Sequence, residues 1–86
     1  MKHATGKTLK TLESLLREIR KSQHLKEKNH GIFYLKSKAY LHFHEDEEGT
    51  FADVKKGNKW VRLKVPDNKK EWKKFARKLL IYSGRH

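Results

Sequence analysis

Residues 32–65 contain four short runs that are rich in aromatic and β-branched residues. The runs are Ile32 to Leu35, Ala39 to His44, Thr50 to Val54 and Trp60 to Val65. They are separated by Lys-Ser-Lys, by an acidic loop containing Gly49 and by Lys-Gly-Asn. Segments of this kind form turns. We therefore expect an antiparallel meander of three or four strands in the middle of the chain.

Two amphipathic segments flank this predicted sheet. Leucine and isoleucine recur every three or four residues from Leu9 to Ile19, which predicts a helix over about 7–25 that ends within 26–31. Asn68 is a good N-cap for a second helix, whose apolar face is Trp72, Phe75, Ala76, Leu79 and Leu80. Two such helices pack most economically on one sheet face. The expected fold is α+β, in the order α-β-β-β(-β)-α.

The size of the chain predicts one domain over residues 1–86, with residues 1–6 as a flexible tail. Cysteine is absent, which excludes disulfides, thiolate catalysis and cysteine-ligated metals and fits a reducing compartment. No stretch approaches the roughly 18 apolar residues that span a bilayer, and the first residues lack an apolar signal core. We expect a cytoplasmic protein without a membrane partner or a cofactor.

Positive charge is concentrated at the C-terminal end. The chain has 22 Lys and Arg against 10 Asp and Glu, a net charge of +12. Residues 31–54 carry two basic and five acidic side chains, whereas residues 55–86 carry twelve basic and two acidic ones. Seventeen of the basic residues are lysines, which lack the planar fork that reads base edges. The charge favours a polyanionic partner, bound by its backbone, although lysine also serves simply to keep small domains in solution.

Strand alternation divides the sheet into a covered and an open face. The covered face is expected to hold Ala39, Leu41, Phe43, Ala52, Val54, Val61, Leu63 and Val65. The open face is expected to hold Tyr40, His42, His44, Phe51, Asp53, Lys55, Trp60, Arg62 and Lys64. Three large aromatics beside cations suit single-stranded nucleic acid, because rings stack on bases while cations hold phosphates. Alternatively, they form an aromatic cluster covered by a second copy, as in a homodimer, or by a protein partner.

The final helix is the second candidate surface. Its basic side chains collect opposite the apolar stripe, where they can hold phosphates. The predicted nucleic-acid site is therefore Lys70, Lys73, Lys74, Arg77 and Lys78 from this helix, with Tyr40, Phe51, Trp60, Arg62 and Lys64 from the sheet. Double-stranded RNA-binding domains share the α-β-β-β-α order, and lysines of their last helix grip phosphates. That similarity is one of topology, because their glycine-serine-lysine-lysine-x-alanine-lysine start is absent.

His42 and His44 are the only metal-ligand candidates that the spacing brings together. Two residues apart on a strand, both imidazoles project from one face. A hydrolytic metal site needs three or more ligands, and the third would have to come from the acidic loop at 45–48 or from His30. No phosphate-binding glycine loop, nucleophile elbow or buried carboxylate pair is evident. We therefore expect no metal and no enzyme activity, and a metal-dependent hydrolase that uses His42 and His44 is the minority alternative.

The strand segment resembles a group of short bacterial proteins of unassigned function. The resemblance lies in Leu41-His42-Phe43-His44-Glu45-Asp46 and Phe51-Ala52-Asp53-Val54, and it covers about residues 31–65. It implies a bacterial αβ module and no particular activity.

Overall fold

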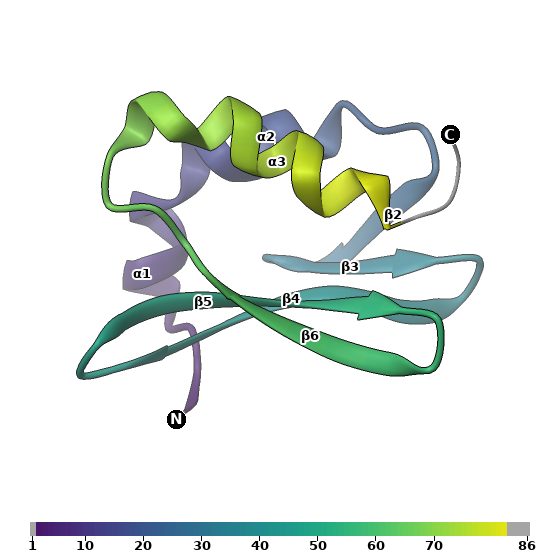
Figure 1. Cartoon of the computed structure of the whole chain (residues 1–86), viewed down its shortest axis with the longest axis horizontal. Helices are drawn as coiled ribbons and strands as arrows, with labels where there is room; N and C mark the ends of the chain where they lie inside the picture. The colour runs from purple at the N-terminus through teal and green to yellow at the C-terminus, as the bar shows by residue number, and fades with distance from the viewer. Residues whose placement is uncertain (1, 83–86) are drawn as a thin grey trace.

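The chain folds into a sheet that is covered on one face by helices (Figure 1). The computed structural model describes residues 2–82. Its elements are β1 (Lys2–His3), α1 (Gly6–Thr11), α2 (Glu13–Arg20), β2 (Leu25–Asn29), β3 (Ile32–Leu35), β4 (Lys38–Asp46), β5 (Gly49–Lys56), β6 (Lys59–Lys64), the 3₁₀ helix η1 (Lys69–Glu71) and α3 (Trp72–Ile81). No helix within residues 2–82 is both long enough and apolar enough to cross a membrane.

The sheet is an antiparallel meander in the order β2-β3-β4-β5-β6. The short β1 pairs with the C-terminal half of β4, where His3 lies opposite His44. The predicted α+β class and meander are confirmed, and the four predicted strands correspond to β3, β4, β5 and β6. Two further strands, β1 and β2, were not expected from the sequence.

The first helical region is shorter than predicted and is divided in two. A single residue, Leu12, separates α1 from α2, and the Thr11 hydroxyl donates to the Thr8 carbonyl 2.6 Å away, a contact that bends helices. The helix ends at Arg20 rather than near Leu25, because the apolar stripe stops at Ile19 and the next turn has nothing to pack against the core.

Residues 25–29 form the edge strand β2, where a helix end was predicted. Most of its side chains are exposed, so no apolar alternation marks it in the sequence. It is held by Glu27, which accepts hydrogen bonds from the Arg20 guanidinium and, at 2.8 Å, from the Gly31 N–H. This strand is therefore held in position by a polar network around Glu27 rather than by a continuous apolar face.

The N-terminal residues differ from the expected flexible tail. Ala4 N–H donates to the Phe43 carbonyl at 3.0 Å, which continues the β1–β4 pairing. Thr5 caps α1, since its hydroxyl accepts from the Thr8 N–H at 3.2 Å. Met1 lies outside the described residues. Backbone pairing and a cap thus order this segment, although its side chains gave no sign of a strand.

A β-bulge reverses the side-chain alternation at the start of β4. Tyr34 pairs with Ala39, but Phe33 pairs with Leu41, so Tyr40 is an extra residue. Tyr40 therefore points into the core, where it is 2% exposed and its hydroxyl donates to the Leu79 carbonyl of α3. The prediction that Tyr40 lies on the open face is wrong, as is the prediction that Ala39 is covered.

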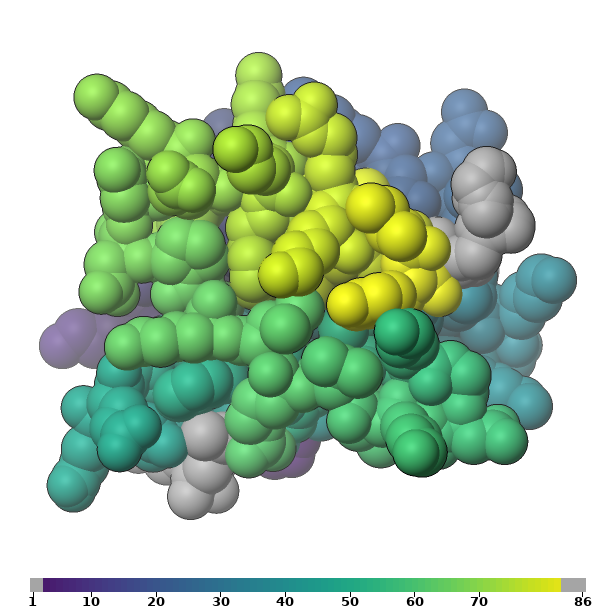
Figure 2. All heavy atoms as spheres, in the orientation of Figure 1, coloured from purple at the N-terminus to yellow at the C-terminus, as the bar shows by residue number. Residues whose placement is uncertain are grey.

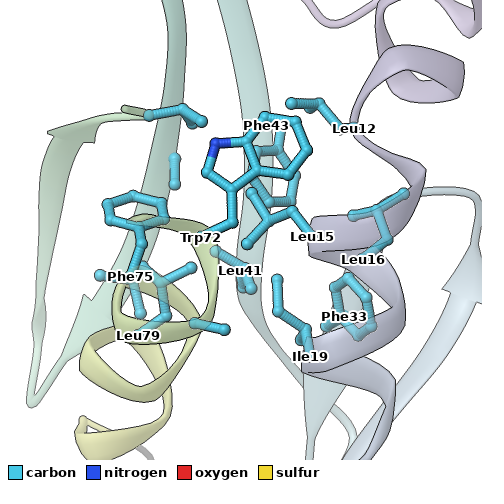
Figure 3. Close-up of a cluster of buried hydrophobic side chains, with 14 of the residues drawn as sticks. Leu12, Leu15, Leu16, Ile19, Phe33, Leu41, Phe43, Trp72, Phe75 and Leu79 are labelled. Atoms are coloured by element: carbon cyan, nitrogen blue, oxygen red, sulfur yellow. The ribbon is translucent and has the colours of Figure 1, made fainter. Parts of the chain in front are cut away.

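The core lies between the sheet and the helices α2 and α3. Leu15, Leu16 and Ile19 of α2 face Phe33, Leu41 and Phe43 of the sheet, with Trp72, Phe75 and Leu79 of α3 beside them (Figure 3). Each fully buried side chain of this size contributes about 1.5 to 3 kcal/mol relative to exposure. The predicted N-cap is confirmed, because the Asn68 side chain accepts from the Lys70 N–H at 2.9 Å. This core fixes which side of α3 faces the solvent.

Candidate functional site

A basic surface covers the outer side of η1 and α3. Since Trp72, Phe75, Ala76 and Leu79 occupy the buried stripe of α3, its cations are forced outward. The five helix residues predicted to hold phosphates are all exposed: Lys70, Lys73, Lys74, Arg77 and Lys78. Figure 2 shows this face, on which the green and yellow side chains of the C-terminal third predominate. Residues 55–82, which supply it, contain eleven Lys and Arg against two acidic residues.

A groove runs between β6 and α3 within this surface. It has a volume of about 340 Å³ and is lined by Leu63, Lys64, Pro66, Glu71, Lys74, Phe75 and Lys78. Lys74 and Lys78 are one helical turn apart, and Lys64 lines the groove from the end of β6, with its ammonium beside Gly49 of β5. Lysine side chains and one carboxylate therefore border a shallow apolar floor. Such a groove attracts an anionic chain more strongly than a single compact anion.

The cations of this surface have no carboxylate partner within residues 2–82. None of the five helix cations forms an ion pair with a described carboxylate, and the same holds for Lys64. The first half of the chain differs, because Arg20 binds Glu13 and Glu27 there and Lys21 binds Glu18. The surface, called the basic face below, consists of Lys64, Lys70, Lys73, Lys74, Arg77 and Lys78.

The open face of the sheet is less aromatic than predicted. Tyr40 has turned into the core, and Phe51 is half-buried. Trp60 is 43% exposed, but its ring is flanked by the Lys55 ammonium, 4.9 Å from the ring centroid, and by His42, with centroids 4.8 Å apart. The predicted stacking surface is thus reduced to one tryptophan, whose ring is already in contact with Lys55 and His42.

Arg62 is held by a buried carboxylate. Asp53 is 5% exposed and accepts from Arg62 Nε at 2.7 Å and from a terminal nitrogen at 2.9 Å. Burial acts to raise the pKa of Asp53, but the Arg62 hydrogen bonds and the nearby His44 outweigh it, so the pKa lies below its usual value. The guanidinium fork of Arg62 is therefore occupied, and its predicted role in nucleic-acid contact is correspondingly weakened.

Histidine side chains meet beside this ion pair. His44 Nε2 lies 2.8 Å from His42 Nδ1 and 3.0 Å from Asp53 Oδ2. His3 of β1 stacks on His44, with ring centroids 4.7 Å apart. Burial is the main cause that lowers the pKa of His42, and the neighbouring His44 adds to it. His42 is therefore a neutral ligand or acceptor around pH 7.

The two predicted surfaces lie on opposite sides of the core. The basic face belongs to the helix layer and the β6 edge, whereas His42, His44 and Trp60 lie on the uncovered side of the sheet. The sequence prediction missed His3 as a member of the histidine cluster, because β1 was taken as a tail. The sequence carries no local signal that distinguishes His3 from the other histidines of the chain, of which there are six in all.

Comparisons with known proteins do not add a relative. A scan against protein-family models and searches of curated proteins and of solved structures gave no match. Function is therefore argued from these residues alone.

Proposed function

We propose that this protein binds the sugar–phosphate backbone of nucleic acid, without strong sequence preference, through the basic face. The observation that supports this most is the set of six exposed cations, from Lys64 to Lys78, that have no carboxylate partner among the described residues. Clustered like charges repel one another and destabilise the fold unless a polyanion neutralises them. An anionic chain lying in the groove between β6 and α3 would do so.

The chemistry of these side chains favours phosphate over base contacts. Five of the six are lysines, which act as point charges and carry no planar fork. Arg77 supplies the one guanidinium of the basic face. The guanidinium of Arg62, on the open face, is held by Asp53. Sequence-specific reading depends on bidentate contacts to base edges. Binding is therefore expected to position the protein on a backbone rather than to select a sequence.

A duplex is favoured over a single strand as the ligand. Proteins that bind single strands without sequence preference rely on several aromatic side chains for stacking. Here Trp60 is the only aromatic of the open face that is strongly exposed, and it lies on the far side from α3. A helix that carries cations on successive turns instead meets the regular phosphates of a double helix. Duplex RNA or DNA is thus the proposed ligand.

The salt dependence of binding tests this proposal. For duplex DNA the slope of log K against log salt is about −0.9 per phosphate contact. If four to six cations of the basic face engage, the slope lies between about −3.6 and −5.4. Fluorescence anisotropy with labelled duplex RNA, duplex DNA, single strands and heparin, over about 50 to 300 mM salt, measures it.

A charge-reversed variant with a matched control locates the surface. Lys73→Glu with Lys74→Glu should reduce the magnitude of the slope by about two, one for each lost contact. Lys7→Glu with Lys10→Glu changes the net charge equally but lies on α1, and it should keep the slope near that of the wild type. Equal losses in both variants would show a general charge effect and would contradict the proposed surface.

A second candidate function is self-association or protein binding through the open face. The observation that favours it is Trp60, which is 43% exposed on the edge strand β6. Isolated exposed aromatics are ordinary, and Lys59 and Lys64 on the same edge oppose strand-to-strand pairing. Sedimentation of wild type and Trp60→Glu tests it, because a dimer formed by this face would dissociate in the variant. A monomeric wild type would remove self-association as a function of this face.

A further inference from the structure

Three histidines converge on the open face of the sheet. His42 and His44 project from β4, and β1 brings His3 against them, so that one ring nitrogen from each lies within 4.8 Å of the others. His42 and His44 are half-buried, while His3 is exposed. Two segments that are about 40 residues apart in the chain therefore supply the cluster, and only the pairing of β1 with β4 brings them together.

Within the cluster, one nitrogen of His44 lies close to two other polar atoms, and a single hydrogen cannot bond well to both. His44 Nε2 faces both His42 Nδ1, at 2.8 Å, and Asp53 Oδ2, at 3.0 Å. An imidazole nitrogen offers either one hydrogen or one lone pair. A single N–H on His44 Nε2 cannot point at both partners with good geometry, and a bare lone pair there would face the Asp53 carboxylate even if His42 Nδ1–H donates to it. A cation bound by the two imidazole nitrogens, with the Asp53 carboxylate beside it, would remove this conflict.

We propose that His3, His42 and His44 form a binding site for one divalent transition-metal ion, with Zn²⁺ as the expected occupant. Neutral imidazoles suit zinc, which takes three protein ligands and an open fourth position in catalytic sites. Because His3 is exposed, the fourth position faces the solvent. An incoming ligand there would be water or an anionic oxygen.

The observed separations are close to those of a zinc site. At about 2.0 to 2.1 Å per Zn–N bond, two nitrogens on a tetrahedral ion are about 3.3 Å apart. His42 and His44 must therefore separate by about half an ångström from their 2.8 Å contact. The His3 nitrogen must move inward by up to about 1.5 Å. Rotation of partly exposed rings achieves both changes without moving the strands.

Asp53 and Arg62 complete the surroundings of the site. Asp53 Oδ2 lies 3.0 Å from His44 Nε2, the nitrogen that also faces His42, so this carboxylate borders the proposed metal position and its negative charge favours a cation there. Arg62 fixes both oxygens of this carboxylate, so Asp53 keeps its position and its charge offsets the guanidinium. Arg62 is half-exposed and would attract an anionic ligand of the metal. We assign Asp53 an electrostatic role beside the metal rather than that of a ligand.

Calorimetric titration of the untagged, full-length protein with ZnCl₂ tests the site. The expected result is one Zn²⁺ per chain, and an affinity at least about 10-fold weaker in His3→Ala and in His42→Gln. His24→Ala removes an exposed histidine outside the cluster and should leave the affinity unchanged. Circular dichroism confirms that each variant is folded. No binding by the wild type, or equal weakening by His24→Ala, would overturn the proposal.

A second measurement identifies the atoms without any substitution. Nuclear magnetic resonance of the imidazole nitrogens should show shifts at His3, His42 and His44 with one equivalent of Zn²⁺, and none at His24 or His30. Co²⁺ should give the visible absorption of a low-coordinate site. Shifts confined to other histidines would refute the proposed metal site. The basic face lies across the core, so Lys73→Glu with Lys74→Glu should not change Zn²⁺ affinity, and the two proposals can fail separately.

Discussion

Replacing Tyr40 with phenylalanine removes one hydroxyl from the buried layer between β4 and α3. The ring is 2% exposed, and its hydroxyl donates to the Leu79 carbonyl near the C-terminal end of α3. Carbonyls at this end of a helix lack intrahelical partners, so the bond fastens α3 to the sheet. Phenylalanine keeps the ring packing and leaves the carbonyl without this donor. The substitution therefore isolates the hydrogen bond made possible by the β-bulge.

The expected cost is about 1.5 kcal/mol, within the range for leaving a buried acceptor unpaired. In a domain of this size 1 kcal/mol corresponds to about 4 to 8 °C in Tm. Tyr40→Phe should therefore lower Tm by about 6 to 12 °C in thermal unfolding followed by circular dichroism. Tyr34→Phe is the matched control, because Tyr34 is only partly buried on β3 and none of its described contacts uses the hydroxyl. Its effect should stay within about 0.5 kcal/mol. Equal shifts in the two variants would refute the assignment of Tyr40 to the core.

The buried hydroxyl of Tyr40 should also make the folded protein less stable at high pH. Burial raises the pKa of Tyr40 above its ordinary value, and Tyr82 nearby adds to the effect. In the unfolded chain the phenol ionises near pH 10, whereas in the folded protein it stays neutral to higher pH. Its contribution to stability is thus complete below about pH 10 and is lost as the pH rises further. Denaturant unfolding should show a steeper alkaline decline for the wild type than for Tyr40→Phe, and parallel declines would contradict this.

Two further substitutions test the placement of β2 and its turn. Hydrogen bonds from Arg20 and Gly31 outweigh burial and lower the pKa of Glu27, so its contribution is present above about pH 4.3 and lost as the pH falls through the folded pKa. Glu27→Gln should cost about 1 to 2 kcal/mol at pH 7 in urea unfolding and progressively less below pH 4, whereas a pH-independent cost would contradict the network. Gly31 and Gly57 both have positive φ, but a Cβ on Gly31 would lie 2.6 Å from Leu9 Cδ2, while Gly57 has open space. Gly31→Ala should therefore destabilise by about 1 to 3 kcal/mol more than Gly57→Ala, and equal effects would place Leu9 elsewhere.

Apolar periodicity predicted the parts of the fold that bury apolar side chains. The strands β3 to β6 and the helix α3 were recognised because burial makes one face of each apolar, as with Phe43 on β4 and Phe75 on α3. The exposure of Lys73 and Lys74 followed from the same stripe. The charge of the basic face could therefore be read from the sequence.

Three features could not be read in this way, because long-range pairing rather than local pattern determines them. β2 is polar and is held through Glu27, and β1 gains its order from pairing with β4. The bulge at Tyr40 depends on the register between β3 and β4, which alternation alone does not reveal. These features also change the candidate sites, since the bulge removes Tyr40 from the open face and β1 brings His3 to His44.

Chemical-shift mapping shows directly whether nucleic-acid backbone binds the basic face. Backbone amide resonances would be followed while a short duplex RNA or DNA is added to the full-length protein at low salt. If the basic face binds the duplex, the largest shifts will lie in β6, η1 and α3, around Lys64, Lys74 and Lys78, and they will disappear as salt is raised. Shifts centred instead on His42 and Trp60 of the open face would contradict it.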